Sequence, residues 1–123
     1  MSLLAIDVGT TGCKVIAFNT GGEILAQAYG EYPLIHPQPG WSELDSNVVW
    51  EEVSDGIRQV AAQTKMHPIE AVSVACQGEA VTPISKSGEI LANAITTFDS
   101  RATGISDEIN QRLSKLEIMQ ITG

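Results

Sequence analysis

The residues with the clearest chemical potential lie near the N-terminus, in the octet Asp-Val-Gly-Thr-Thr-Gly-Cys-Lys at positions 7–14. Backbone N–H groups of a tight turn, two hydroxyls and a lysine cation could bind phosphate there. Asp7 could hold Mg²⁺ through water, because magnesium prefers carboxylate oxygens and retains waters. A Walker-type loop is excluded, because Gly9 and Gly12 stand too close together and Lys14 begins a predicted strand rather than a helix. A phosphate site and a plain hairpin turn both remain open for the octet alone.

Strands on both sides must position this octet. Three largely apolar runs, at residues 3–8, 13–18 and 24–29, are separated by short turns and predict an antiparallel meander. The turn at 19–23 contains two glycines that can take positive φ. Met1 and Ser2 are left outside the first predicted strand.

A helix and a further strand are expected after the meander. The proline-rich segment 35–45 predicts a loop, and Asp45 or Ser46 can cap the helix that follows. Residues 69–75 predict a strand that a helical crossover would make parallel to its neighbour. Residues 82–95 indicate a hairpin around Ser87-Gly88. The apolar face expected on the first helix consists of Val49, Trp50, Val53, Ile57, Val60 and Ala61, and that on a last helix of Ile105, Ile109, Leu113 and Leu116.

The order βββ-α-β, then a hairpin and a helix, predicts an α/β fold. It corresponds to the front half of a ribonuclease-H-like (actin-like ATPase) module, a three-strand antiparallel meander followed by a helix and a parallel strand. A complete module needs further β-α units, so the module is expected to be incomplete in this chain. Such a piece should expose sheet edges and an apolar face. We therefore expect the piece to self-associate as a homodimer, to exchange elements, or to be one part of a chain cut by proteolysis.

Composition and charge limit the classes of partner. The 123 residues have room for one domain or part of one, and 43% hydrophobic residues fit a globular core. A formal net charge of −8 argues against nucleic acid as a partner, which needs a basic face. No membrane span of ~20 apolar residues and no signal peptide is expected. Cys13 and Cys76 are predicted to be buried free thiols, which favours the cytoplasm.

Three segments in one order resemble the FGGY family of carbohydrate kinases, within the superfamily of sugar kinases, Hsp70 and actin. Residues 3–25 contain the family's first phosphate motif, D-x-G-T-[TS]-x-x-[KR]. Residues 38–50 resemble its proline-glycine-tryptophan stretch. Residues 72–103 are similar to the segment that carries sugar contacts and a D-x-R pair. The resemblance covers essentially the whole chain.

The resemblance implies that the full-length protein uses ATP and Mg²⁺ to phosphorylate a hydroxyl group of a sugar or polyol. It places Asp7 near the metal. Glu79 can accept hydrogen bonds and Gln77 can both donate and accept them, which suits a polyol; a polar turn is the alternative for these residues. The residues implied to bind nucleotide phosphate are Gly9, Thr10, Thr11 and Lys14, and those implied to line or brace the sugar pocket are Gln77, Gly78, Glu79, Asp99 and Arg101.

The resemblance also implies what residues 1–123 lack. They correspond to the front part of the family's N-terminal, sugar-binding domain. The catalytic aspartate, the second phosphate loop and the adenosine pocket are expected downstream, so this chain alone should be inactive. Thr97 stands where many members carry tryptophan, which leaves the sugar unidentified. The alternative for Asp99 and Arg101 is a local ion pair, and Trp41 and Trp50 are predicted to be packing residues.

Two other classes of protein remain open at this stage. One is a non-kinase ATPase of the same superfamily, and the other is a catalytically inactive homologue that binds a sugar or a nucleotide. An intact Asp7 and Lys14 argue against the inactive homologue, because both would serve catalysis.

Overall fold

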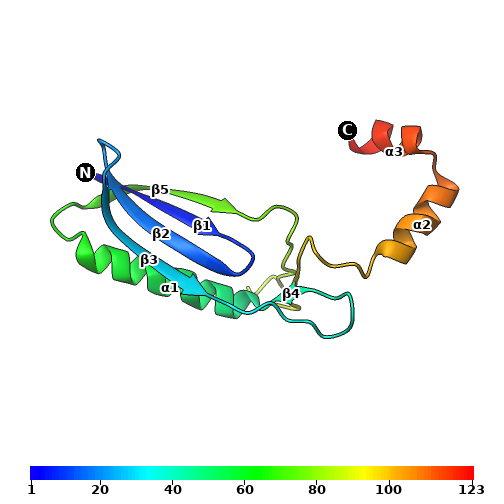
Figure 1. Ribbon diagram of the computed structural model, residues 1–123, viewed down its shortest axis with the longest axis horizontal. Helices are drawn as coiled ribbons and strands as arrows, with labels where there is room; N and C mark the ends of the chain where they lie inside the picture. The colour runs from blue at the N-terminus through cyan, green and yellow to red at the C-terminus, as the bar shows by residue number, and fades with distance from the viewer.

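The computed structural model describes residues 1–123, and its centre is a four-stranded sheet with one long helix on it (Figure 1). Strands β1 (Ser2–Val8), β2 (Gly12–Asn19) and β3 (Ile24–Glu31) form an antiparallel meander. Helix α1 (Ser46–Gln63) then leads to β5 (Ile69–Cys76), which pairs with β1 in parallel. The strand order β3-β2-β1-β5 confirms the predicted meander, helix and parallel strand.

The remaining elements are short and lie beyond one end of this sheet. Strands β4 (Glu43–Leu44) and β6 (Ala94–Ile95) pair with each other in a second, two-stranded sheet. Helices α2 (Thr103–Arg112) and α3 (Lys115–Thr122) follow and stand clear of the main sheet (Figure 1). No helix of the chain is both long enough and apolar enough to cross a membrane.

Helix α1 begins at a cap that the sequence predicted and packs over β2 and β3. The Asp45 carboxylate accepts a hydrogen bond from the Asn47 N–H at 2.9 Å, which satisfies a donor of the first turn. Gly56 lets the helix approach the sheet closely, because a Cβ there would lie 2.8 Å from Cγ2 of Val15. Val53 and Val60 lie in the core on either side of it.

Strand β5 is left uncovered, whereas Leu4 and Ile6 of β1 are buried, and this corrects three predictions. Trp50 is 68% exposed and Ala61 is also exposed, so they are not part of the packed face of α1. Cys13 is buried as predicted, whereas Cys76 is exposed because no element lies over β5. The expected open edge and apolar face are confirmed, since Val74 on β5 is exposed beside Trp50 and β5 pairs only with β1.

Ser2 belongs to the fold, although the sequence left it outside the first strand. It is fully buried, and its hydroxyl donates to the carbonyl oxygens of His67 and Pro68 at 2.8 and 3.2 Å. These bonds fix the chain between α1 and β5 to the start of β1.

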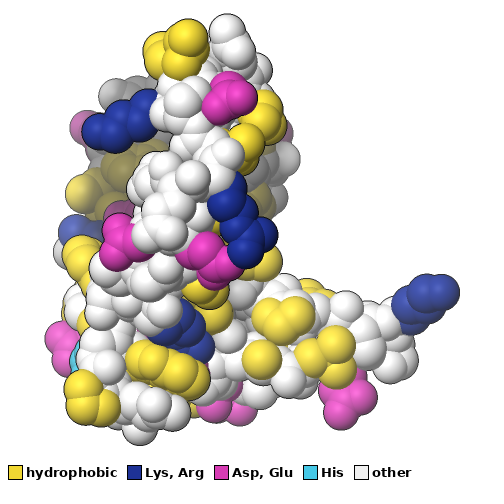
Figure 2. All heavy atoms as spheres, turned by 90° about the vertical axis from the view of Figure 1, so that its right-hand side faces the viewer, with side chains coloured by type: hydrophobic (Ala, Val, Ile, Leu, Met, Phe, Trp, Pro, Cys, Tyr) yellow, Lys and Arg dark blue, Asp and Glu magenta, His cyan; other side chains and the backbone are white.

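The C-terminal region forms two helices where one was predicted. The break comes at Leu113 and Ser114, where Ser114 and Glu117 form a reciprocal capping box that starts α3. Figure 2 looks onto this side of the molecule, where apolar side chains lie exposed among charged ones. The exposed large apolar side chains of α2, α3 and the link between them are Ile105, Ile109, Leu113, Leu116, Met119 and Ile121.

The predicted hairpin of residues 82–95 is present in a minimal form. A bridge pairs Ile84 with Ile90, and Gly88 takes a φ of +86° in the turn between them. The end of this segment, β6, pairs with β4, and Ile95 also bridges to Val81, directly before the segment.

Candidate functional site

The turn between β1 and β2 (residues 9–12) has open hydrogen-bond donors. Its only internal backbone bond runs from the Gly9 N–H to the Gly12 carbonyl oxygen at 2.9 Å. The N–H groups of Thr10 and Thr11 donate to no protein group. Neighbouring N–H groups without partners attract an anion. The geometry therefore favours the phosphate interpretation of this turn over a purely structural one.

Asp7 and Lys14 face each other across β1 and β2, next to this turn. They form a directly opposed pair in the antiparallel register, and both side chains are exposed. They lie on the face opposite α1, since the alternating neighbours Cys13 and Val15 are buried under the helix. Lys14 forms no ion pair with any carboxylate of the chain. Its cation is thus available to a ligand at the turn.

The donor set around Asp7 fits only one kind of metal site. No group of three or more histidine, cysteine, aspartate or glutamate side chains is placed to hold an ion. A single carboxylate suits Mg²⁺ that is held mainly by waters and by substrate phosphates. It does not suit an ion enclosed by protein ligands.

Gly12 is a residue of this site that sequence reasoning missed. A Cβ at this position would lie 2.6 Å from the Gly30 carbonyl oxygen and 2.7 Å from the Tyr29 hydroxyl. Its φ is not in the left-handed region, so space, not backbone conformation, requires glycine here. The spacing of two glycines in the octet was the available signal, but the close approach of β3 that makes Gly12 necessary depends on the folded sheet.

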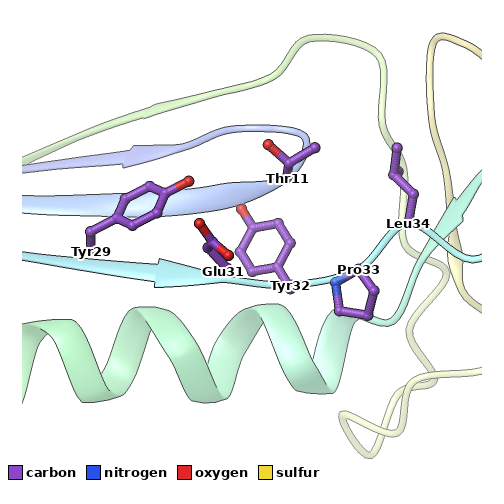
Figure 3. A pocket seen from close by; sticks show the side chains of 6 residues that line it. All are labelled: Thr11, Tyr29, Glu31, Tyr32, Pro33 and Leu34. Carbon is purple, nitrogen blue, oxygen red and sulfur yellow. The ribbon is translucent and has the colours of Figure 1, made fainter.

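Tyr32 is a second residue that the sequence did not single out. Figure 3 shows the groove beside the turn and the phenol of Tyr32 with its oxygen directed toward the turn. That hydroxyl donates to the Gly9 carbonyl oxygen at 2.8 Å. Burial of the side chain is the main reason why the pKa of Tyr32 is raised to about 12. Tyr32 directly follows β3, and no pattern in the sequence separates it from an ordinary buried tyrosine.

The predicted sugar-contact residues Gln77, Gly78 and Glu79 lie at the same edge of the sheet as the turn. The Gln77 N–H donates to the Val8 carbonyl oxygen at 3.0 Å, which extends the β1–β5 pairing to the ends of both strands. The side-chain oxygen Oε1 of Gln77 is buried and has no hydrogen-bond partner. A buried acceptor without a donor is costly, so a donor from a ligand would stabilise it.

Glu79 has an unusual backbone conformation. Its φ is +64°, the only positive value at a residue other than glycine in the chain. The left-handed region costs an ordinary residue on the order of 1–2 kcal/mol. Backbone strain of this kind is frequent at functional sites. The strained residue here carries an exposed carboxylate and lies just after the C-terminal end of β5.

Asp99 and Arg101 form part of an ionic cluster that we term the clasp, which consists of these two residues with Trp41, Ser42 and Glu43. The Asp99 carboxylate accepts hydrogen bonds from the Ser42 N–H at 2.7 Å and from Arg101 Nε at 2.8 Å. Arg101 Nη2 donates to Asp99 and to Glu43, both at 2.7 Å. The guanidinium also stacks 3.8 Å from the centre of the Trp41 ring.

The clasp ties the chain before α2 to the loop before α1. It is more than the local pair that was one alternative for Asp99 and Arg101, because Arg101 also bridges to Glu43, far away in sequence. No hydrogen bond or ion pair joins the clasp to residues 77–79. The structure thus brings the β1–β2 turn and residues 77–79 to one edge, and gives Asp99 and Arg101 a bracing position. Of the two tryptophans predicted to pack, Trp41 does so.

Acid should weaken the clasp. Hydrogen bonds from Arg101 are the main reason why the pKa values of Asp99 and Glu43 lie below their ordinary values of 3.8 and 4.5. Because folding lowers both pKa values, their contribution to stability is present above about pH 4.5 and is lost as the pH falls through the folded-state values. We expect Asp99→Asn to flatten the fall of the thermal midpoint between pH 5 and pH 3, followed by circular dichroism. The exposed Glu51→Gln is the matched control, and an equal flattening in that control would contradict the role of the clasp.

The sequence has clear relatives. The family model described as the N-terminal domain of the FGGY family of carbohydrate kinases matches residues 2–123. A glycerol kinase of Rippkaea orientalis is 35% identical over 124 residues, covering 98% of this chain and 25% of the relative. A glycerol kinase of Janthinobacterium sp. is 36% identical over 110 residues, covering 87% of this chain and 22% of the relative. The chain thus spans about a quarter of the length of these relatives.

Solved structures give the same result for the fold. A glycerol kinase of Plasmodium falciparum with ADP superimposes with a TM-score of 0.88 at 21% identity, covering 92% of this chain and 23% of that one. A ligand-bound xylulose kinase of Lactobacillus acidophilus gives a TM-score of 0.80 at 27% identity, covering 90% and 22%. These likenesses confirm the predicted α/β, actin-like fold and its partial extent.

Proposed function

This chain belongs to the FGGY family of carbohydrate kinases, and we propose that the whole protein transfers the γ-phosphoryl group of ATP to a hydroxyl group of a sugar or polyol. One observation carries the proposal. The β1–β2 turn, with unbonded N–H groups at Thr10 and Thr11, lies at the same sheet edge as Gln77, whose buried oxygen lacks a donor. Phosphoryl transfer to a hydroxyl group needs a site that binds phosphate, here the turn, next to a site that binds hydroxyl groups, here Gln77.

The β1–β2 turn would serve the nucleotide. Gly9 supplies a turn with little bulk, Thr10 and Thr11 supply N–H and hydroxyl donors, and the Lys14 cation offsets the charge of the terminal phosphates. Mg²⁺, when bound, would neutralise phosphate charge, and Asp7 would orient it through water. Phosphoryl transfer depends on such positioning and charge compensation more than on covalent chemistry by the protein.

Residues 77–79 would serve the acceptor. Glu79 would accept a hydrogen bond from one hydroxyl, Gln77 Oε1 would accept from another, and Gly78 leaves open space for the ligand, since nothing lies within 4 Å of a Cβ built there. Asp99 and Arg101 would brace the loops around this pocket. Glycerol is the first acceptor to test, because the relatives at 32–36% identity are named glycerol kinases.

The rest of the machinery would come from outside this chain. We place residues 1–123 at the front of the sugar-binding N-terminal domain, with the catalytic base and the adenosine pocket supplied by the remainder of the protein. Residues 1–123 alone would then be inactive. The need for ATP and the two free thiols support a cytoplasmic location. The uncovered edge of β5 supports self-association of the isolated piece, whereas the charge of −8 supports neither nucleic acid nor an anionic membrane surface as a partner.

The test uses the full-length protein with ATP, Mg²⁺ and a panel of glycerol, xylulose and gluconate, followed by ADP release. We expect turnover with one of these acceptors. Glu79→Gln should raise the KM for that acceptor about 10- to 100-fold, the value of a hydrogen bond to a charged group, with little change in the KM for ATP. Glu89→Gln, an exposed glutamate in the 82–95 segment, is the matched control and should leave both KM values unchanged.

The rival within the family is a homologue that binds without catalysis. Calorimetry would establish that rival if an acceptor bound tightly while no acceptor of the panel supported release of ADP from ATP. This result would overturn the kinase proposal. The non-kinase ATPases of the wider superfamily are disfavoured by the match of the whole chain to the carbohydrate kinase family.

A further inference from the structure

We infer that Tyr32 is a positioning residue for the nucleotide site: its side chain and backbone hold the β1–β2 turn in the orientation that presents the turn's N–H groups to phosphate. The inference rests on the proposed function, because it concerns the same turn. It assigns Tyr32 no contact with substrate.

Tyr32 makes two hydrogen bonds to the turn from one place. Its hydroxyl donates to the Gly9 carbonyl oxygen at 2.8 Å, and its backbone N–H donates to the Thr11 carbonyl oxygen at 3.2 Å. The side chain is only 3% exposed and belongs to the main apolar cluster, so its ring is held firmly. Both bonds thus anchor the turn, which is bounded by Gly9 and Gly12, to a residue that is packed in the core.

Because the peptide bond is planar, the two hydrogen bonds from Tyr32 also fix the direction of the N–H groups in the turn. In a trans peptide the C=O of one residue and the N–H of the next point in opposite directions. The Gly9 carbonyl is held toward Tyr32, so the Thr10 N–H is directed away from it. The Thr11 carbonyl is held on the same side. A carbonyl turned the other way would place a negative dipole where phosphate oxygens would bind.

The internal hydrogen bonds of the turn do not restrain the Gly9 carbonyl group. Of the two backbone bonds that could join Gly9 and Gly12, only the one from the Gly9 N–H is made, and the Gly9 carbonyl accepts from Tyr32 instead. The hydroxyl remains a donor at neutral pH, because burial disfavours its ionisation. Losing that donor would leave the Gly9–Thr10 peptide plane without a restraint on its carbonyl side.

The test compares Tyr32→Phe with Thr64→Val in the full-length protein. Thr64 is also buried, and its hydroxyl also donates to a backbone carbonyl, that of Val60 at 3.0 Å, but at the far end of α1. Tyr32→Phe keeps the ring and should fold. We expect it to lower kcat/KM for ATP about tenfold, the value of one lost hydrogen bond, without changing the KM for the acceptor. Thr64→Val should lower the thermal midpoint without changing either kinetic parameter.

Two results would overturn the inference: unchanged ATP kinetics in Tyr32→Phe, or an equal loss in Thr64→Val, which would mean that only stability is involved. Calorimetry with Mg·ATP keeps this separate from the proposed function. A protein that binds Mg·ATP without turnover refutes the kinase proposal, yet a tenfold weaker Kd in Tyr32→Phe alone would still support Tyr32. A wild-type protein that does not bind Mg·ATP at all would refute both.

Discussion

Replacing Lys14 by methionine is expected to lower kcat/KM for ATP by about 10²–10³-fold in the full-length protein, the usual effect of removing one electrostatic donor from a transition state. Lys14 is exposed and forms no ion pair, so the variant removes a charge without leaving a carboxylate unpaired. The fold should therefore remain unchanged. Methionine keeps most of the apolar stem, which limits the change to the cation.

Lys86→Met is the matched control for this prediction. Lys86 is another exposed lysine, in the turn of the 82–95 segment, and its loss should leave ATP kinetics as they are. Steady-state rates at varied ATP, with acceptor saturating, separate the two variants. If Lys14→Met retained wild-type kcat/KM, the β1–β2 turn would have to be given a structural role only.

Gly12→Ala should damage both stability and activity. The new methyl group would meet the backbone oxygen of Gly30 at 2.6 Å, and a backbone atom cannot move aside without displacing β3. Overpacking of this kind costs about 1–3 kcal/mol. The displaced turn should also lower kcat/KM for ATP about 10²-fold, since a shift near 1 Å is enough for such a loss.

Urea unfolding of the variant and its ATP kinetics test the two parts of this prediction. Gly104→Ala is the matched control, because a Cβ at Gly104 in α2 meets nothing within 4 Å and alanine favours a helix. That control should be neutral or slightly stabilising. Equal stability of Gly12→Ala and wild type would show that the sheet can absorb the methyl group.

Elements governed by local patterns were predictable from the sequence. The apolar runs of the meander, the cap at Asp45 and the parallel β5 follow from periodicity, capping chemistry and crossover rules. The break between α2 and α3 also had a local signal, a serine three residues before Glu117, which the apolar spacing of a single long helix obscured.

The exposure of individual side chains and the close approach of one strand to another were not predictable from local sequence patterns. Trp50 fits the apolar spacing of α1, but α1 lies over β2 and β3, so the side of the helix that carries Trp50 has no partner. Which strands a helix covers depends on the whole assembly. The same limit applies to Gly12 and Tyr32, whose roles depend on how closely β3 approaches the turn.

The sequence grouped the candidate site residues through the motif resemblance, and the structure places the β1–β2 turn and residues 77–79 at one end of the sheet. The motif resemblance placed Lys14 and Glu79 in roles, and the geometry added what motifs do not contain. The free N–H groups at Thr10 and Thr11, and the positive φ of Glu79, depend on backbone conformation. The bracing network of Arg101 depends on contacts distant in sequence.

The uneven attachment of β5 has a consequence for local opening. β5 pairs with β1 on one edge only and no helix packs on it, whereas β2 lies between two strands and under α1. Opening free energy is lowest where few buried contacts hold an element. Within these residues, amide hydrogens of β5 should therefore exchange with solvent long before those of β2. Residues 77–79, which would bind the acceptor, then follow β5, the strand that opens most easily. The β1–β2 turn, which would bind phosphate, leads into β2, the more protected strand.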